Sequence, residues 1–240
     1  MACGVAAGVA CALVLIRAFP RQPRGPIALD DVTAETGISF RHTDGSSGRR
    51  YIVESVAAGL AVFDYNGDGY LDVYFLNGGP LKGTEFERPP TNALYRNEGN
   101  WQFTDVTQQA GVADTGHGLG VACADYDNDG DQDLYLNNYG PNVLYRNNGD
   151  GTFTDVTERA GVANGDKVGA GTCFLDADAD GDLDLYVSNY VDFTYENHVP
   201  CSVDGMPAYA GPCDYRAVPD TLYHNNGDGT FADVSTESGI

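Results

Sequence analysis

Short runs in which apolar and polar residues alternate recur along the chain, and turns rich in Gly, Asn and Asp separate them. Three segments contain four such runs each: residues 58–107, 118–157 and 168–235. Alternation over about four to eight residues predicts a β-strand with one buried and one exposed face. Each segment therefore predicts four short strands, and the short turns between them predict antiparallel pairing.

The second half of each segment repeats most closely. It reads NALYRNEGNWQFTDVT at 92–107, NVLYRNNGDGTFTDVT at 142–157 and DTLYHNNGDGTFADVS at 220–235. An Asn/Gly/Asp turn between two alternating runs is the signature of a β-hairpin. Four-stranded units that repeat about every fifty residues are typical of propeller blades, which cover one another's faces by stacking around a ring. The predicted fold is an all-β propeller with about three blades in this chain.

The ring is predicted to be incomplete, because propellers have about four to eight blades. An additional Asp-Val-Thr at 31–33 has no blade before it, so we expect residues 27–40 to supply an N-terminal strand that pairs with the last blade of the ring. Residues 27–240 are thus predicted to form a partial propeller. We expect the remaining blades of a longer chain, or other copies of this chain, to complete it.

Residues 1–26 differ in composition from the repeats. Residues 2–16 are uncharged and apolar, and Arg17, Arg21 and Arg24 follow in a proline-rich stretch. A run of fifteen residues is short for a membrane span but fits the apolar region of a signal peptide. A signal anchor is the alternative, and the prolines disfavour a buried N-terminal helix. We therefore expect a secreted, periplasmic or envelope-anchored protein that meets a membrane only through this segment.

Acidic loops of nine residues join the first two predicted strands of each segment. All three read D-x-[DN]-x-D-G-x-x-D, and carboxylates crowded in this way repel one another unless a cation lies among them. Oxygen atoms at positions 1, 3, 5 and 9, with a backbone carbonyl at position 7, suit a hard ion such as calcium. The predicted calcium ligands, in about three sites, are Asp64, Asn66, Asp68, Tyr70, Asp72, Asp125, Asp127, Asp129, Asp131, Asp133, Asp176, Asp178, Asp180, Asp182 and Asp184.

An EF-hand is the nearest alternative motif, but it requires a bidentate Glu at position 12 and flanking helices. Position 12 is Phe75, Leu136 or Val187 here, and predicted strands flank every loop. Asp/Asn/Gly turns that bind no metal are the other alternative. Three loops in the same register favour calcium, and Asn66 makes the first loop the least acidic.

Charge and cysteine content narrow the environment and the partners. The net charge is −22, and the three loops hold 13 of the 35 acidic residues. So acidic a chain is a poor partner for nucleic acid or for an anionic membrane surface. Cys201 and Cys213 lie in an irregular stretch rich in Gly, Pro and Tyr, which a disulfide would stabilise in an exported protein.

Irregular connections on one rim of the predicted propeller are candidate binding surfaces. The longest spans residues 191–219, and long loops on a rigid scaffold commonly carry recognition. Its aromatic and basic side chains either anchor a ligand or pack the insertion against its own blade. These candidate ligand-binding residues are Tyr195, His198, Tyr209, Tyr215 and Arg216.

Catalytic motifs are scarce. The chain has no G-x-S-x-G, P-loop or H-E-x-x-H sequence. The four histidines are dispersed. His224 takes the position that Arg96 and Arg146 hold in the other repeats, which indicates a structural surface residue rather than a ligand or base.

The repeats resemble FG-GAP/VCBS repeats, the calcium-bearing propeller blades also found in integrin α heads. The runs FDYNGDGYLDVYFLNGG, ADYDNDGDQDLYLNNYG and LYRNNGDGTFTDVTERAGV are more closely similar to the ASPIC/UnbV and cartilage acidic protein family. The resemblance covers about residues 27–240 and includes that family's cysteine-bearing insertion. The second cysteine of the family usually precedes Gly-Pro, whereas Ala210 holds that position here and Cys213 follows it.

The resemblance implies an extracellular or envelope protein without an established enzymatic activity. We expect a calcium-binding module that binds or scaffolds a protein or a glycan, for example in cell adhesion, and is not an enzyme. The rival hypothesis is a carbohydrate-active lyase or dehydratase whose active site lies partly in missing blades. Such a site would gather basic residues from several blades, whereas the chain has only 13 Lys and Arg residues, three of them within residues 1–26.

Overall fold

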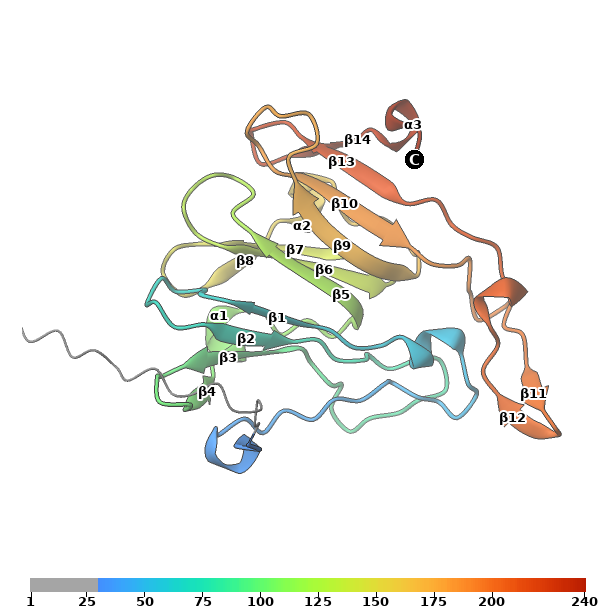
Figure 1. Ribbon diagram of the computed structural model, residues 1–240. Coiled ribbons are helices and arrows are strands. Elements are labelled where there is room, and N and C mark those ends of the chain that lie inside the picture. Colours follow the sequence, from blue (N-terminus) through green and yellow to red (C-terminus); the bar gives the residue numbers. More distant parts are fainter. Residues whose placement is uncertain (1–29) are drawn as a thin grey trace, which may run out of the picture. The chain divides into compact units, whose positions relative to one another are not determined.

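The alternating runs form strands that pair into three four-stranded antiparallel sheets, here called blades 1, 2 and 3 (Figure 1). The computed structural model describes residues 30–240, so the predicted leader at 1–26 lies outside the described residues. Blade 1 contains β1 (Leu60–Phe63), β2 (Asp72–Phe75), β3 (Ala93–Asn97) and β4 (Phe103–Asp105). Blade 2 contains β5 (His117–Ala124), β6 (Asp133–Tyr139), β7 (Val143–Asn147) and β8 (Phe153–Asp155). Blade 3 contains β9 (Gly169–Leu175), β10 (Asp184–Asn189), β13 (Thr221–Asn225) and β14 (Phe231–Asp233).

The fold class predicted from the repeats is confirmed. In every blade each strand pairs with the next strand of that sheet in the order of the chain, as in a propeller blade. The first strand of blade 2 lies between the first strands of its neighbours, β1 and β9. Within residues 30–240 the sheets stack side by side and do not close into a ring (Figure 1).

The hydrophobic core lies between the blades rather than inside any one of them. Leu134 and Leu136 of β6 belong to an apolar cluster shared with blade 1, whereas Tyr135 belongs to a cluster shared with blade 3. All three side chains are fully buried. Because successive side chains of a strand point to opposite faces, the continuous apolar run of β6 covers both neighbours at once. Burial of one such side chain stabilises the fold by about 1.5–3 kcal/mol.

A short helical turn follows the last strand of each blade. These turns are α1 (Thr107–Ala110), α2 (Thr157–Ala160) and α3 (Ser235–Ser238), with the related 3-10 turn η1 (Thr33–Glu35) before blade 1. A glycine with positive φ ends each of the three α-helical turns, as Gly111 does at φ 78°. Glycine adopts this left-handed conformation without the steric cost that a Cβ brings.

The prediction of an N-terminal strand at 27–40 is wrong for the described part of that segment. Residues 30–40 contain η1 and no strand. The backbone amide of Phe103 donates to the carbonyl of Thr36 at 2.8 Å, and Phe40 stacks on Phe75 with 4.8 Å between ring centroids. Residues 36–40 thus cover the outer face of blade 1. The predicted strand is missing because Asp-Val-Thr marks the end of a blade, where a helical turn follows the last strand.

The connection between β10 and β13 carries additional elements. It contains the hairpin of β11 (Cys201–Val203) and β12 (Met206–Ala208), followed by the 3-10 turn η3 (Pro212–Asp214). The predicted disulfide is not formed, since the thiols of Cys201 and Cys213 are both free. Ala210, at the position where the related insertion has its second cysteine, is buried, whereas Cys213 is exposed on η3. No helix in residues 30–240 has the length and apolar character needed to cross a membrane.

Candidate metal centres

The three acidic loops fold in the same way and are called loop 1 (64–72), loop 2 (125–133) and loop 3 (176–184). Each joins the first strand of its blade to the second. In loop 2, the first carboxylate, Asp125, accepts hydrogen bonds from the amides of Asp129 at 3.0 Å and Gly130 at 2.9 Å. Gly130 has φ 99°, so its lack of a side chain permits the tight return of the chain. Equivalent hydrogen bonds form in loops 1 and 3.

The aspartate at position 9 anchors each loop to the sheet. Asp133 is fully buried, and it accepts hydrogen bonds from the amides of Asn147 at 2.7 Å and Tyr126 at 3.1 Å. Asp72 and Asp184 are held in the same way. A single carboxylate therefore connects the loop, the second strand and the third strand of its blade.

Burial of these carboxylates changes their protonation. Burial is the main reason why the pKa of Asp133 rises to about 7, and neighbouring carboxylates raise it further. The two backbone hydrogen bonds oppose this rise. Burial likewise raises the pKa of Asp72 to about 6. A buried carboxylate among other carboxylates holds its charge poorly without a compensating cation.

Two loops bring their carboxylates together. One oxygen atom from each of Asp125, Asp127 and Asp133 lies within 4.8 Å of the other two in loop 2. The carboxylates of Asp176, Asp178 and Asp180 converge within the same distance in loop 3. In loop 2, Oδ1 of Asp127 is buried and has no hydrogen-bond partner. Such an atom costs about 1–3 kcal/mol unless something compensates it. The oxygen-only donor set and this bare oxygen fit a hard cation such as calcium.

Other predicted ligands are placed differently. No comparable group of three acidic residues is found at loop 1 in the described chain, where Nδ2 of Asn66 donates to Asp68 at 3.0 Å. At position 7 of loop 3, Asp182 accepts a hydrogen bond of 2.8 Å from Asn128 of loop 2. That side chain links two blades, which leaves the backbone carbonyl as the predicted ligand at position 7. Tyr70, at the same position of loop 1, is half-exposed.

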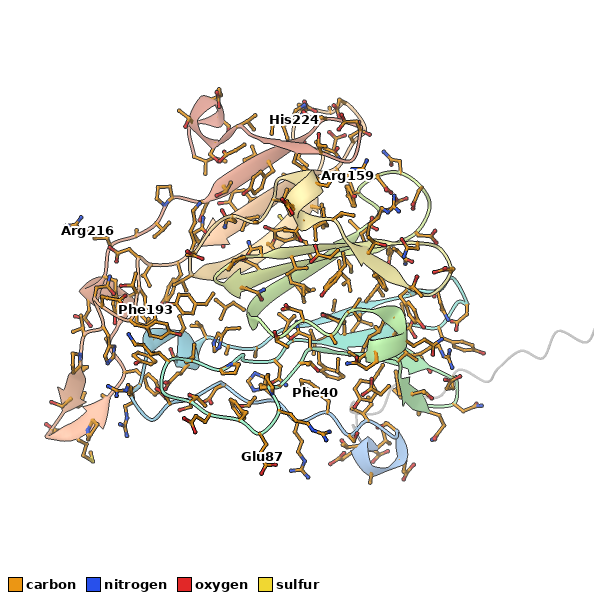
Figure 2. The ribbon with its side chains drawn as sticks, turned by 180° about the vertical axis from the view of Figure 1, so that it is seen from behind. Phe40, Glu87, Arg159, Phe193, Arg216 and His224 are labelled. Carbon is orange, nitrogen blue, oxygen red and sulfur yellow. The ribbon has the colours of Figure 1, made fainter. Side chains whose placement is uncertain are left out.

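A histidine that the sequence assigned to the surface lies against loop 3. Nδ1 of His224 is 3.2 Å from Oδ1 of Asp184 and 3.5 Å from Oδ2 of Asp178. His224 lies on β13 in blade 3 (Figure 2). In the sequence, His224 is distinguished by its position in the repeat, because the equivalent residues are Arg96 in blade 1 and Arg146 in blade 2. The convergence with two loop aspartates follows only from the pairing of β10 with β13.

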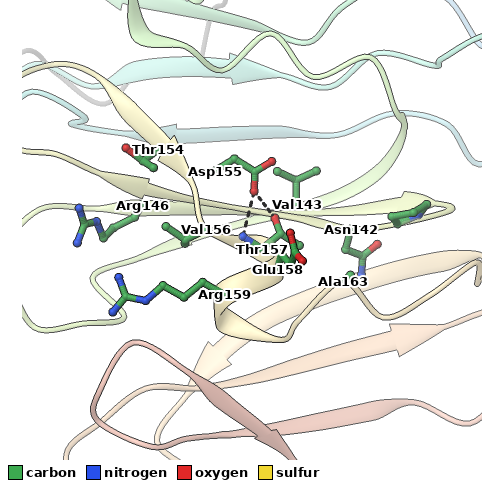
Figure 3. Close-up of a pocket in the computed structure, with 11 residues that line it drawn as sticks. Asn142, Val143, Arg146, Thr154, Asp155, Val156, Thr157, Glu158, Arg159 and Ala163 are labelled. Carbon is green, nitrogen blue, oxygen red and sulfur yellow. Dashed lines mark hydrogen bonds between the residues drawn. The ribbon is translucent and has the colours of Figure 1, made fainter.

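A groove of about 770 Å³ lies along the outer strands of blade 2 (Figure 3). Arg146 and Arg159 line it, and Nε of Arg146 is buried without a hydrogen-bond partner. Asp155 and Glu158 line it too. Oδ1 of Asp155 accepts hydrogen bonds from the backbone amide and the hydroxyl of Thr157. Two acidic residues balance the two arginines, so the lining has no net charge that would select an anion.

The insertion of blade 3 (residues 191–219) packs against the segment that precedes blade 1, which contains Tyr51. Tyr195 and His198 contact Tyr51, with ring centroids 5.1 Å and 4.9 Å apart, and Tyr215 lies 5.9 Å from Phe193. This packing differs from the alternative predicted from the sequence, in which these residues pack against their own blade. It arises because Tyr51 lies in an apolar cluster with Leu119 of blade 2 and Phe193 of the insertion.

The other two candidate ligand-binding residues lie at the edge of this packing. The hydroxyl of Tyr209 donates to Oε2 of the buried Glu54 at 3.1 Å. The amide of Arg216 donates to Oδ1 of Asp192 at 2.9 Å, and its side chain points outward (Figure 2). Tyr209 therefore ties the insertion to the segment before blade 1. Arg216 remains directed toward solvent, where a ligand has access to it.

Comparisons with known proteins agree with the repeat architecture. Residues 64–136 and 125–187 match the FG-GAP-like repeat family. Each match begins at the first aspartate of an acidic loop, Asp64 or Asp125. Together they span residues 64–187, which is more than half of the 240-residue chain.

Cartilage acidic protein 1 of Mus musculus is 32% identical over 199 residues, and that of Homo sapiens is 33% identical over 200 residues. Each alignment covers 77% of this chain, but only 27% and 26% of the relative. The chain thus spans about a quarter of the length of these relatives. A solved lectin structure from Agrocybe aegerita aligns over 73% of this chain and 37% of its own, with 16% identity and a TM-score of 0.35, which is too low to support an argument.

The family match, the three four-stranded sheets and the three loops in one register describe the same repeat. The chain belongs to the FG-GAP-like repeat family.

Proposed function

We propose that the chain is an extracellular calcium-binding propeller module that binds a protein or a glycan without catalysing a reaction. One observation carries the calcium part: three carboxylates of loop 2 converge within 4.8 Å, and one of them, Asp133, is fully buried. Relation to cartilage acidic protein 1, which is named after an extracellular tissue, supports the setting. Extracellular calcium modules bind at about 0.1–1 mM, a concentration range that exterior calcium reaches.

The ion acts as a structural clamp in this proposal. It neutralises the carboxylates that each loop crowds together and holds the first strand of the blade to the second. Since Asp133 also accepts the amide of Asn147, the clamp extends to the third strand, β7. The side chains at positions 1, 3, 5 and 9 and the carbonyl at position 7 would hold the ion, as the sequence predicts.

Replacement of Asp133 by Asn tests the calcium part. Asn keeps the size of the side chain and an acceptor for the amide of Asn147, but it removes the buried charge. We expect the variant to bind one calcium ion fewer, or to bind it at least tenfold more weakly, in isothermal titration and in metal analysis after dialysis. Asp150→Asn is the matched control, because Asp150 is an exposed aspartate of a hairpin turn. Equal stoichiometry in Asp133→Asn and the wild type would contradict the proposal.

Exposed apolar residues on the insertion support the proposal that the chain binds a protein or a glycan. Val203 and Met206 are 58% and 68% exposed on the β11–β12 hairpin, and exposed apolar residues of this kind serve as contacts for partners. The rigid sheets beneath them provide the scaffold on which such loops commonly carry recognition.

The binding part is tested with Met206→Asp on a glycan array and on immobilised extracellular-matrix proteins. We expect signal on one of the two surfaces from the calcium-loaded wild type, and at least a tenfold loss in the variant with an unchanged melting temperature. Trp101→Asp is the control, because Trp101 is 70% exposed in the hairpin turn between β3 and β4, away from the insertion. Absence of signal on both surfaces, or an equal loss in both variants, would refute this part.

A further inference from the structure

Loop 3 differs from the other two loops by an imidazole. Asp178, Asp184 and His224 each offer one donor atom, and the three atoms lie within 4.8 Å of one another. Arg96 and Arg146 occupy the equivalent position in blades 1 and 2, and a guanidinium has no lone pair to give to a metal. Only in blade 3, among the described blades, does this strand position carry a metal-binding side chain.

The distances fit coordination better than a direct ion pair. Nδ1 of His224 is 3.2 Å from Asp184 and 3.5 Å from Asp178. A charge-assisted hydrogen bond would bring nitrogen and oxygen to about 2.7–2.9 Å. Donor atoms that lie about 2.0–2.1 Å from a tetrahedral ion are separated from one another by about 3.4 Å. The spacing around His224 is that of ligands around a small ion.

The carboxylate of Asp184 is fixed in advance. Its side chain is 3% exposed, and it accepts the amides of Asn225 at 2.8 Å and Ala177 at 3.0 Å. Hydrogen bonds of this kind orient a metal ligand before the ion arrives. His224 itself is 34% exposed in the described chain.

A second substitution opens space at the same place. Position 2 of the loop is a tyrosine in blades 1 and 2, where Tyr65 and Tyr126 pack on phenylalanines of the next blade. Loop 3 has Ala177 there, and this alanine lines a cavity of about 320 Å³ together with His224 and both aspartates. The small side chain of Ala177 leaves room beside the three donors for a further ligand such as water.

We propose that loop 3 binds a divalent transition metal, with Zn²⁺ as the best match, through Asp178, Asp184 and His224. Imidazole suits zinc and its neighbours, whereas calcium sites consist of oxygen ligands, and three protein ligands with an open fourth position are a known zinc arrangement. The inference rests on the proposed calcium function for loop 3, since the two ions share Asp178 and Asp184. Zinc and calcium therefore compete at this loop and not at loops 1 and 2.

The test compares the full chain with His224→Arg, which installs the residue that blades 1 and 2 have at this position. Dialysed protein is titrated with Zn²⁺, with Co²⁺ as a visible-absorption probe of tetrahedral coordination, and separately with Ca²⁺. We expect one Zn²⁺ per chain in the wild type and at least a 30-fold weaker affinity in His224→Arg, with calcium stoichiometry unchanged. His224→Gln serves as the second variant, and melting in EDTA checks that both variants fold.

The outcomes separate the two proposals. Loss of zinc affinity with calcium binding retained supports the zinc site. Zinc affinity within threefold of the wild type in both variants overturns it, while normal calcium titration leaves the proposed function intact. A wild type that binds calcium but no zinc also overturns it. A chain that binds neither ion refutes both.

Discussion

Chelation with EDTA should lower the melting temperature of the chain by about 10 °C relative to protein in 1–2 mM calcium. An ion that is present at about ten times its dissociation constant stabilises the folded state by about 1.4 kcal/mol per site. Three sites would contribute about 4 kcal/mol, and in a domain of this size 1 kcal/mol shifts the melting temperature by about 2–4 °C. Differential scanning calorimetry at neutral pH provides the measurement.

Physical reasons for a large effect lie in the loops themselves. Without an ion, Asp133 remains buried beside the other acidic residues of loop 2, and Oδ1 of Asp127 lacks a hydrogen-bond partner. Addition of excess calcium after chelation should restore the original transition, whereas an equal concentration of magnesium should restore less, since magnesium requires a stricter octahedral geometry. Coinciding transitions with and without EDTA would show that the loops are metal-free turns.

Asn147→Ala should destabilise the fold by about 2 kcal/mol more than Asn97→Ala does. Both asparagines end the third strand of a blade and accept an amide of the hairpin turn that follows. Each also donates to a carbonyl of its own blade, that of Leu71 or Gln132. Only Asn147 donates in addition to the carbonyl of Tyr65 in the neighbouring blade, at 2.8 Å.

The pair therefore differs by one hydrogen bond between blades and by the deeper burial of Asn147. Asn147 is fully buried, so its loss leaves the carbonyl of Tyr65 without its donor, and an unsatisfied buried acceptor costs about 1–3 kcal/mol. Urea denaturation in saturating calcium measures both variants under the same metal conditions. Equal midpoints for the two variants would mean that the bond between blades contributes nothing to stability. Asn225, which donates to Tyr126 at 2.8 Å, offers an independent repeat of the experiment.

Local patterns predicted the parts of the fold that local interactions determine. Strand alternation, the Asn/Gly/Asp turns and the nine-residue loops depend on neighbours within a few positions, and all three blades follow them. The repeat also predicted that blades stack, because a four-stranded sheet of this kind needs cover on both faces. β6 shows this directly, with Leu134 and Tyr135 directed to different neighbours.

Contacts between distant segments were not predictable in the same way. Nothing near Tyr51 indicates that it meets Tyr195 and His198, because those residues come together only when the insertion folds back. Similarly, the repeat alignment revealed that His224 replaces an arginine, but its distance from Asp184 depends on the register between β10 and β13.

Two further predictions, the disulfide and the N-terminal strand, differ from the structure. The disulfide was inferred from the irregular Gly/Pro/Tyr-rich stretch that holds Cys201 and Cys213, and the thiols of both residues are free. The N-terminal strand was inferred from an Asp-Val-Thr copy, yet apolar cover for blade 1 determined where residues 36–40 pack. Calcium loading, the leader and the identity of the partner stay predictions.

Placement of the core between the sheets has an evolutionary consequence. A blade cut out of this chain would expose apolar surface on the faces that its neighbours now cover, so the repeat is a unit of inheritance without being a unit of folding. Gene duplication can lengthen such a protein only by whole sheets, since a partial repeat would leave its neighbour uncovered. Substitutions on either face must then be tolerated by two repeats at once, and this couples the divergence of adjacent copies.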